Sequence, residues 1–221
     1  MKLLILAANG QIARLVENRI LSEEEFKDVE LTLFLRNKER LSELANDPRV
    51  TLIEGDLNNA QDVIQAAKGQ DMIFSAVVDH DDAGHNRPTK NIIQAAKENK
   101  VPRVIETSLL GLYDEVPGEF GRWNCEYCFN GDPTGTTPVL ADELLEASGL
   151  DYTTLRLPWL NDRDEIKYEI THRHEPFVGV SGSRKSIADV VLKIVKDPSF
   201  GSKDSLGIAD PTTQGQDRPV Y

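Results

Sequence analysis

The sequence predicts an α/β domain built on a doubly wound parallel sheet, and three observations support that prediction. Short runs that are apolar nearly throughout alternate along the chain with amphipathic stretches of helical length. Strands of this kind are buried on both faces, because helices cover both sides of a parallel sheet. The first run leads directly into a glycine-containing loop, and 221 residues are enough for one sizeable core.

Six runs are predicted as strands, and most segments between them as helices. The predicted strands are residues 1–6, Val29–Asn37, Arg49–Asp56, Asp71–Val78, Val101–Gly111 and Asp151–Pro158. A helix is predicted after the first loop, and further helical segments are Lys38–Ala45, Asn59–Ala67, Thr89–Asn99 and Val139–Ser148. Since connections between parallel strands are right-handed, this order indicates a Rossmann-type domain.

Two regions depart from this alternation. Residues Leu112–Pro138 are rich in glycine and proline, which predicts a long loop after a late strand, and such loops are often functional. Beyond Leu160, the segments EIKYEITHR and PFVGVSG predict short strands, and RKSIADVVLKIVKD predicts a helix. We expect residues 1–160 to form the Rossmann core. Residues 161–221 are then a small C-terminal, substrate-side cap and tail of the same domain.

Composition limits the classes of partner. The chain has 37 acidic and 25 basic residues, a net charge of −12, so we expect no nucleic acid partner, because phosphates require a basic surface. No apolar run approaches the roughly 20 residues that span a bilayer. The first strand is too short for a signal peptide and lacks a cleavage pattern. We expect a cytoplasmic protein without a membrane partner, either a monomer or a homodimer.

Cys125 and Cys128 are the two cysteines of the chain and form a C-x-x-C pattern. A structural zinc site needs two more ligands, and there is no second C-x-x-C. A thioredoxin-type pair would begin a helix after a strand, whereas this one follows Gly121–Asn124. The pattern favours two small, partly buried thiols. No metal site is predicted from them, and their role stays open.

The loop after the first strand, AANGQIAR, retains one of the three glycines of a dinucleotide-binding fingerprint. Gly10 has the middle position, where the backbone must approach a pyrophosphate closely. Ala7 and Ala13 replace the other two, and Ala7 costs about 1 kcal/mol if its φ is positive. The loop can still direct amides and a helix N-terminus at a pyrophosphate. The alternative is a plain strand–turn–helix without a ligand.

The end of the second predicted strand indicates which nucleotide would bind. An NAD site has an acidic residue there that binds the ribose 2′-hydroxyl. This chain has Arg36 instead, and its first carboxylate is Glu39. An arginine binds a 2′-phosphate through charge-assisted, bidentate hydrogen bonds, and Arg14 on the first helix is a second candidate cation. Arg36 could also be a solvated charge paired with Glu39. The pattern favours NADP, with NAD possible.

Four segments, AANGQIARLV, LTLFLRNKERL, VTLIEGDL and SGLDYTTLRLPWL, resemble the atypical short-chain dehydrogenases/reductases, in the NmrA-like, NAD(P)H-binding, flavin-reductase-like branch. The similarity extends from Lys2 to about Pro211. It implies cofactor-binding roles for Ala8, Asn9, Gly10, Gln11 and Ile12 in the pyrophosphate loop, Arg36 at the 2′-phosphate, Asp56 and Leu57 beside the adenine, Ser75, Ala76 and Val77 towards the nicotinamide ribose, Thr107 and Ser108 near the nicotinamide, and Pro158 behind its ring.

The Tyr-x-x-x-Lys pair of that family is missing. Neither Tyr113 nor Tyr127 is followed by lysine at that spacing, and no lysine occurs between Lys100 and Lys167. Without a cationic neighbour, a tyrosine keeps a pKa of about 10 and is a poor acid or base at neutral pH. Tyr113 stays the nearest candidate catalytic tyrosine after Ser108. Ordinary carbonyl or alcohol chemistry is therefore not favoured.

A polar segment, VVDHDDAGHN, follows the fourth predicted strand at the edge of the sheet where ligands bind. Its three carboxylates and two imidazoles could hold a divalent metal or transfer protons; these residues are Asp79, His80, Asp81, Asp82 and His85. A solvated loop that caps the next helix is the favoured interpretation. His80 is the candidate proton donor near the nicotinamide.

Two further sets of residues have open roles. His172 and His174 alternate in a predicted strand, so both could meet one ligand or both could lie on a surface strand. Trp123 and Trp159, with Tyr113, could form a lid or floor for a flat substrate, or they could be packing anchors. The substrate pocket would lie between residues 113–123 and 158–163.

These features together predict an NADPH-dependent oxidoreductase that transfers hydride to a flat acceptor such as a quinone or flavin. Such a small, aromatic or quinone-like substrate needs orientation and stacking more than a tuned tyrosine. Ser108 would orient the nicotinamide or the substrate, and His80 or solvent would supply the proton. The alternative is a non-catalytic NADP(H)-sensing regulator of NmrA type. A third hypothesis is a hydrolase-like or metal-dependent enzyme that uses the His80–His85 loop.

Overall fold

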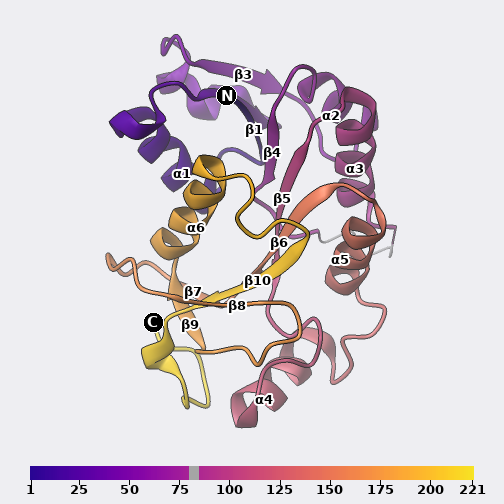
Figure 1. Ribbon diagram of the computed structural model, residues 1–221, viewed down its shortest axis with the longest axis vertical. Helices are drawn as coiled ribbons and strands as arrows, with labels where there is room; N and C mark the ends of the chain where they lie inside the picture. The colour runs from indigo at the N-terminus through magenta and orange to yellow at the C-terminus, as the bar shows by residue number, and fades with distance from the viewer. Residues whose placement is uncertain (80–84) are drawn as a thin grey trace.

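The computed structural model describes residues 1–79 and 85–221. Its main sheet has eight strands in the order β3-β2-β1-β4-β5-β6-β10-β8, and neighbours are parallel except β8, which is antiparallel to β10. The first six strands have the order of a Rossmann fold, so the predicted doubly wound sheet is confirmed (Figure 1). The eight strands are β1 Lys2–Leu6, β2 Glu30–Leu35, β3 Val50–Glu54, β4 Met72–Ser75, β5 Arg103–Leu109, β6 Asp151–Leu157, β8 Glu169–Thr171 and β10 Asp204–Ala209.

Helices cover both faces of this sheet (Figure 1). On one face α1 (Gln11–Ser22) packs beside α6 (Arg184–Lys196). The other face is covered by α2 (Ala60–Ala66), α3 (Arg87–Asn99) and α5 (Thr137–Ala147). The expected layers follow from strands that are apolar on both sides, since each side must be buried.

Strand β1 illustrates how one short run joins the two cores. Leu3 and Ile5 are fully buried in the core beneath α1 and α6, whereas Leu4 and Leu6 are fully buried in the core beneath α2 and α3. Successive side chains of a strand point to opposite faces, so four consecutive apolar residues serve both cores. The strand ends at the loop that precedes α1, which places that loop at the carboxyl edge of the sheet.

The segment after β6 contributes strands both to the main sheet and to a second, smaller sheet. Its strands β8 and β10 extend the main sheet, and α6 covers it beside α1. The short strands β7 (Trp159–Asn161) and β9 (Ser181–Ser183) form a second, parallel sheet in the lower left half of the molecule in Figure 1, above α4. The division of the chain into residues 1–160 and 161–221 stays a prediction.

The predicted loop Leu112–Pro138 contains a helix, α4 (Gly118–Phe129). One of the glycines that suggested a loop, Gly121, has a packing role instead. A Cβ at Gly121 would lie 1.9 Å from the backbone oxygen of Val116, so a glycine lets the helix pack against the segment that leads into it. Phe120 and Phe129 are buried at the two ends of α4, which explains why it forms despite its poor local propensity.

The described residues also form three short 3₁₀ segments: η1 (Glu24–Phe26), η2 (Lys38–Leu44) and η3 (Pro211–Thr213). The helix expected over Lys38–Ala45 is therefore a 3₁₀ segment, and it is interrupted at Leu41, where φ is −122°. Leu41 is fully buried, so packing of this side chain holds the segment against the core. The segment directly follows β2 and carries side chains to the carboxyl edge of the sheet.

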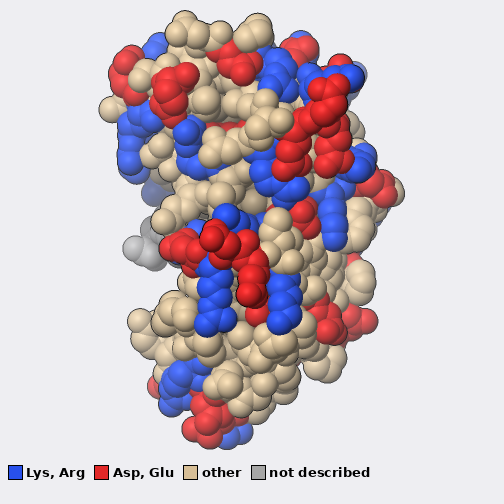
Figure 2. All heavy atoms as spheres, turned by 90° about the vertical axis from the view of Figure 1, so that its left-hand side faces the viewer, with Lys and Arg blue, Asp and Glu red and all other residues tan. Residues whose placement is uncertain are grey.

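The surface is acidic overall but mixed in sign. Figure 2 shows acidic and basic side chains interspersed over the face it presents. Several oppositely charged side chains of the described residues form ion pairs, such as Arg19 with Asp189 and Arg184 with Asp162. Of the helices in the described part of the chain, none combines the length and the apolar character that crossing a membrane requires.

Candidate functional site

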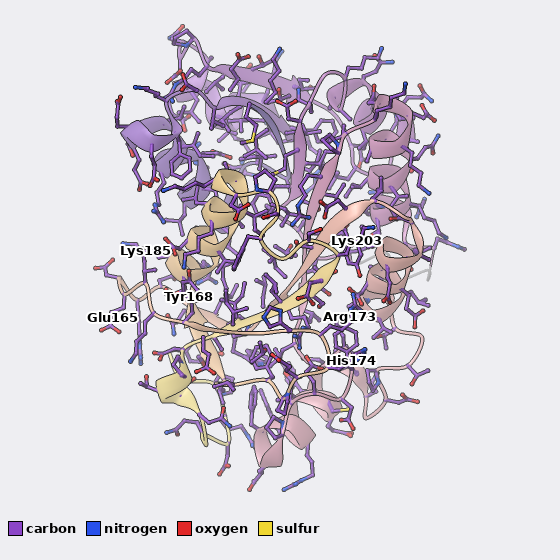
Figure 3. The ribbon with its side chains drawn as sticks, in the orientation of Figure 1. Glu165, Tyr168, Arg173, His174, Lys185 and Lys203 are labelled. Carbon is purple, nitrogen blue, oxygen red and sulfur yellow. The ribbon has the colours of Figure 1, made fainter. Side chains whose placement is uncertain are left out.

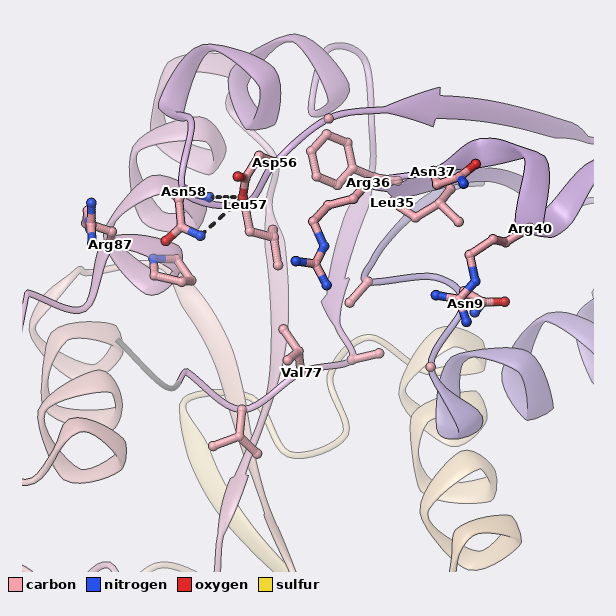
Figure 4. Close-up of a pocket in the computed structure, with 17 residues that line it drawn as sticks. Asn9, Leu35, Arg36, Asn37, Arg40, Asp56, Leu57, Asn58, Val77 and Arg87 are labelled. Carbon is pink, nitrogen blue, oxygen red and sulfur yellow. Dashed lines mark hydrogen bonds between the residues drawn. The ribbon is translucent and has the colours of Figure 1, made fainter. Parts of the chain in front are cut away.

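The carboxyl edge of the sheet holds a cavity of about 1020 Å³ (Figure 4). Its walls come from the segments that follow β1, β2, β3 and β4 and from the start of α3. The strand order reverses between β1 and β4, and ligands of doubly wound folds bind at such a reversal. The residues that line the cavity are Ala7, Asn9, Gly10, Phe34, Leu35, Arg36, Asn37, Arg40, Gly55, Asp56, Leu57, Asn58, Ala76, Val77, Val78, Arg87 and Pro88.

Two arginines lie at the β2 side of this cavity. Arg36 follows β2 and points into the cavity, and Arg40 lies beside Asn9 (Figure 4). In the amide orientation that satisfies both groups, Oδ1 of Asn9 accepts hydrogen bonds from Arg40 Nε at 3.1 Å and Nη2 at 2.9 Å. Among the described residues that line the cavity, Asp56 is the one carboxylate. The β2 side is therefore positively charged and built to hold an anion.

The loop after β1 brings backbone close to this cavity. Gly10 is the N-cap of α1, and no side chain caps the helix. Helix N-termini leave several backbone N–H groups without partners in the helix, and these groups favour phosphate. A Cβ at Gly10 would lie 3.3 Å from the oxygen of Ala7 and 3.6 Å from that of Ala76, so glycine keeps the loop narrow. These residues would fit a pyrophosphate, and the role predicted for Gly10 stays a prediction.

Ala7 adopts a left-handed backbone, with φ of 57°. It is one of the two positions where the fingerprint has glycine and this chain has alanine. The conformation is held by a hydrogen bond from the Gly10 N–H to the Ala7 oxygen, at 2.9 Å. The loop thus keeps the shape that glycine would allow, with backbone strain at one residue.

Substituting Ala7→Gly is expected to raise the free energy of unfolding by about 0.5–1 kcal/mol, because glycine adopts positive φ without strain. Urea unfolding monitored by circular dichroism measures the change. Ala8→Gly is the matched control: Ala8 is fully buried, is not among the residues with positive φ, and its loss should destabilise the protein. A destabilised Ala7→Gly variant would contradict the strain at this position.

Comparison with known proteins agrees with this geometry. A family model described as NAD(P)H-binding matches residues 7–198. The chain belongs to the NAD(P)H-binding family. Among curated proteins, none matches it. A Rossmann-fold NAD(P)-binding family protein from Shigella flexneri is 32% identical over 100% of this chain and 98% of that one, with a TM-score of 0.78.

Two further solved structures extend this finding. A short-chain dehydrogenase/reductase of wide type from Veillonella parvula, in complex with NADP, is 28% identical, with a TM-score of 0.86, over 100% of this chain and 99% of that chain. An anaerobillin reductase from Escherichia coli O157:H7 is 18% identical, with a TM-score of 0.75, over 98% and 100%, and shares the fold. The resemblance to atypical short-chain dehydrogenases/reductases is confirmed, and the NmrA-like branch stays a prediction.

The cavity brings together half of the residues predicted to bind the cofactor. Those that line it are Asn9, Gly10, Arg36, Asp56, Leu57, Ala76 and Val77. Asp56 is oriented by its neighbours, since the backbone and side-chain nitrogens of Asn58 donate to Asp56 Oδ1 at 2.9 and 3.1 Å (Figure 4). Gln11 and Ile12 begin α1 beside the cavity but are not among the lining residues, and Ala8 is fully buried.

Arg14 does not supply the second cation of the cavity. Its Nη1 donates to Glu17 at 3.0 Å and its Nη2 donates to Glu43 of η2 at 2.6 Å, so its guanidinium joins α1 to η2. Arg40 instead lines the cavity as the second cation, the role that the sequence predicted for Arg14. The sequence signal for Arg40 is its position four residues after Arg36, but that spacing becomes informative only once η2 is known to turn back over the cavity.

Glu17 makes stability depend on pH. Its side chain is fully buried, and burial raises its pKa from 4.5 to about 7, with Arg14 opposing the shift. The folded protein therefore binds this proton more tightly than the unfolded chain. The resulting stability is fully present below pH 4.5 and is lost as pH rises through about 7.

Glu17→Gln removes that titration. Relative to the wild type, the variant should gain roughly 2–3 kcal/mol of unfolding free energy between pH 5 and pH 8. Urea unfolding at the two pH values measures the difference. Glu43→Gln changes the exposed partner of the same arginine and should alter stability by less than about 1 kcal/mol at either pH. Equal responses of the two variants would contradict a proton on Glu17.

The hydroxyl of Tyr113 is bound to a buried carboxylate. It lies 2.5 Å from Oδ2 of Asp142, and burial together with the negative charge of Asp142 raises the pKa of Tyr113 far above its ordinary range. Arg173 donates to the same oxygen at 2.7 Å and Thr154 donates to Asp142 Oδ1 at 2.6 Å. This geometry argues against the catalytic role predicted for Tyr113, because its proton is neither free nor acidic.

The remaining predicted residues, which come from β4, β5 and the end of β6, do not line the cavity. Thr107 Oγ1 donates to the backbone oxygen of Ser75 at 3.3 Å, which braces the segment Ala76–Val78. Ser108 is buried on β5, and its Oγ has no hydrogen-bond partner in the described part of the chain. Pro158 is buried against β9. The roles of these residues stay predictions, and Ser108 is the one with free hydrogen-bonding capacity.

The histidines differ from expectation. His80, Asp81 and Asp82 lie outside the described residues. The strand predicted to carry His172 and His174 ends at Thr171, so the two do not share a strand face. Figure 3 shows His174 next to Arg173 on the segment after β8. His172 Nδ1 lies 2.5 Å from Asp204, and His174, with φ of 66°, lies edge-on to Tyr113 at 5.0 Å between ring centroids. They do not converge on one ligand.

Two further groups lie on α4. Cys125 and Cys128 are free thiols, and burial raises the pKa of each, which disfavours the reactive thiolate. Trp123 packs against Trp159 at 5.2 Å and Tyr127 at 5.2 Å between ring centroids, so the tryptophans serve as packing anchors for each other. Among residues 1–79 and 85–221, no cluster of His, Cys, Asp and Glu side chains could hold a metal ion.

Proposed function

We propose that the protein is an NADPH-dependent oxidoreductase that transfers hydride to a small, flat acceptor such as a quinone or flavin. One observation carries the choice of NADPH: Arg36 and Arg40 lie together where an NAD site would have a carboxylate. A 2′-phosphate would accept charge-assisted hydrogen bonds from both guanidinium groups. The Veillonella parvula structure in complex with NADP supports the same assignment.

Different residues of the cavity would bind different parts of the cofactor. Arg36 and Arg40 would hold the 2′-phosphate, Gly10 and the start of α1 the pyrophosphate, and Asp56 with Leu57 the adenine. Val77 and Val78 form the wall on the way to the nicotinamide, with Ser108 behind it as an orienting hydroxyl. NADPH, when bound, would supply the hydride.

The test of the cofactor is isothermal titration calorimetry with NADPH and NADH. We expect NADPH to bind more tightly than NADH, and we expect bound NADPH to be oxidised by a benzoquinone or by free flavin mononucleotide. Absorbance of the reduced nicotinamide monitors the reaction. Absence of binding by either nucleotide would overturn the proposal.

A second candidate function is a non-catalytic NADP(H)-sensing regulator. The observation that favours it is the hydroxyl of Tyr113, which is bound to Asp142 in a family whose catalytic tyrosine has a lysine partner. A sensor should distinguish NADP⁺ from NADPH in affinity and should reduce no acceptor. Tight binding of both forms with turnover of a quinone or flavin would exclude it.

A further inference from the structure

A group of buried polar side chains lies next to residues of the cavity wall without lining the cavity itself. Glu106 of β5 is buried, and its Oε1 lies 2.6 Å from the hydroxyl oxygen of Thr89 on α3. The same hydroxyl lies 3.0 Å from Oδ2 of Asp79, in the segment after β4. The Thr89 backbone N–H also donates to Asp79 Oδ2, at 3.3 Å. Two carboxyl groups are thus linked through one hydroxyl.

This link leads from the interior of the sheet towards the cavity. Glu106 pairs in register with Ser75, the last residue of β4, and Ser75 pairs with Leu6, the last residue of β1. Glu106 therefore lies at the level where β1 and β4 end. Asp79 follows Val78, which lines the cavity. Asp79 is itself buried and does not line the cavity, but it is adjacent in the chain to Val78, so the three polar groups lead from β5 to the residue next to the cavity wall.

The geometry requires a proton on one of the two carboxyl groups. A threonine hydroxyl has one proton, so it can donate to one carboxyl group and must accept from the other. Of the two carboxyl groups, Glu106 is the one that holds the proton, because of its environment. Burial, together with the negative charges of Asp79 and Asp142, raises the pKa of Glu106 to about 8, so Glu106 donates to the Thr89 hydroxyl and that hydroxyl donates to Asp79.

The surroundings of Glu106 agree with a neutral carboxyl group. Its Oε2 has no hydrogen-bond partner in the described part of the chain. A buried carboxylate without partners is far more costly than a neutral carboxyl. The groups that face it are Thr89 from α3, Asp79 after β4 and, from α5, Asp142, whose carboxylate is paired with Arg173. Among the described residues, no cation contributes to the shift of its pKa.

We propose that Glu106 stores the proton for the reduction, and that Thr89 and Asp79 form the path by which this proton reaches the cavity edge. The inference rests on the proposed function. It assigns the acid role that Tyr113 cannot fill. Glu106 and Thr89 act through Asp79, and so they are positioning residues in a proton relay.

The acceptor receives a hydride, with its two electrons, from NADPH and one proton from the protein, and NADP⁺ remains. The O–H bond of Glu106 breaks as Thr89 accepts its proton, and Thr89 passes its own proton to the Asp79 carboxylate. Asp79 then protonates the oxygen or nitrogen of the reduced acceptor, and Glu106 takes a proton from solvent to close the cycle.

The first experiment needs no turnover. The infrared difference between the wild type and Glu106→Gln at pH 7 should contain the carbonyl band of a protonated carboxylic acid, and this band should titrate with a midpoint of about 8. The subtraction removes the contribution of Glu17, which is present in both proteins. Absence of the band from the difference spectrum would overturn the inference and would leave the proposed function untouched.

The second experiment tests the path. Thr89→Val removes the linking hydroxyl, and Thr89→Ser retains it. With a benzoquinone as acceptor, Thr89→Val and Glu106→Gln should lower kcat at least about tenfold and flatten the limb of the pH profile near pH 8. Thr89→Ser should keep both the rate and the limb. NADPH affinity, measured by calorimetry, should be unchanged in all three variants.

The outcomes separate the relay from the proposed function. If Thr89→Val has the kcat and pH profile of the wild type, the path is wrong although the enzyme is a reductase. If Thr89→Ser loses activity as Thr89→Val does, the role of Thr89 is structural and the relay is overturned. If the wild type binds NADPH but reduces neither quinone nor flavin, the proposed function fails, and the relay with it.

Discussion

Replacing Arg36 and Arg40 together by alanine is expected to weaken NADPH binding by roughly 10²–10⁴-fold and to leave NADH binding within about threefold of the wild type. Each guanidinium lies on the β2 side of the cavity, where the 2′-phosphate would lie. Hydrogen bonds to charged groups contribute about 1.5–3 kcal/mol each, and about 1.4 kcal/mol is tenfold in affinity. Titration calorimetry with both nucleotides measures the two effects separately.

Lys38→Ala is the matched control for this variant. Lys38 stands between the two arginines in sequence, is exposed, and does not line the cavity. The Lys38→Ala substitution removes a positive charge from the same segment but not from the cavity. The NADPH affinity of this variant should therefore stay within about threefold of the wild type at moderate salt. An equal loss of NADH binding in the double variant would mean that the loop itself had been damaged. Unchanged NADPH binding would place the 2′-phosphate elsewhere.

Arg156→Met is expected to lower the free energy of unfolding by about 3–5 kcal/mol. Arg156 is fully buried, and its Nη1 lies 2.7 Å from Oε1 of Glu115, whose side chain is also buried. Its Nη2 donates to three backbone oxygens, those of Thr171, His172 and Ser205. Glu115 in turn accepts hydrogen bonds from the backbone nitrogens of Gly111 and Tyr113, both at 2.9 Å. Removing the arginine leaves a buried carboxylate without its cation.

Urea unfolding of Arg156→Met, Glu115→Leu and the double variant tests this pair. The double variant should lose clearly less free energy of unfolding than the two single variants lose together, because it leaves no buried charge unpaired. Arg184→Met removes the arginine of the pair with exposed Asp162 and should cost less than about 1 kcal/mol. Strictly additive single effects would show that the two side chains are not coupled.

The arrangement of the first six strands could be predicted from sequence because their burial is encoded locally. A run such as Leu3–Leu6 is apolar at every position, and only a strand covered on both faces places all of these side chains in a core. The same holds for the cofactor loop, where Gly10 and Arg36 have local signals at the expected spacing. Helix α4 lacked such a signal, because Gly121 is explained by its approach to Val116 rather than by a turn.

The sequence by itself determined the doubly wound sheet, the loop at Gly10 and the positive residue at the end of β2, because these depend on hydrophobic period, chain order and residue type. Only the tertiary structure decided which charges meet. It turned Arg14 towards Glu17 and Glu43, brought Arg40 to Asn9, bound Tyr113 to Asp142, and placed Glu106 and Asp79 on one threonine. Side chains that are far apart in the chain become partners through tertiary packing. The local periodicity of the sequence carries no information about that packing.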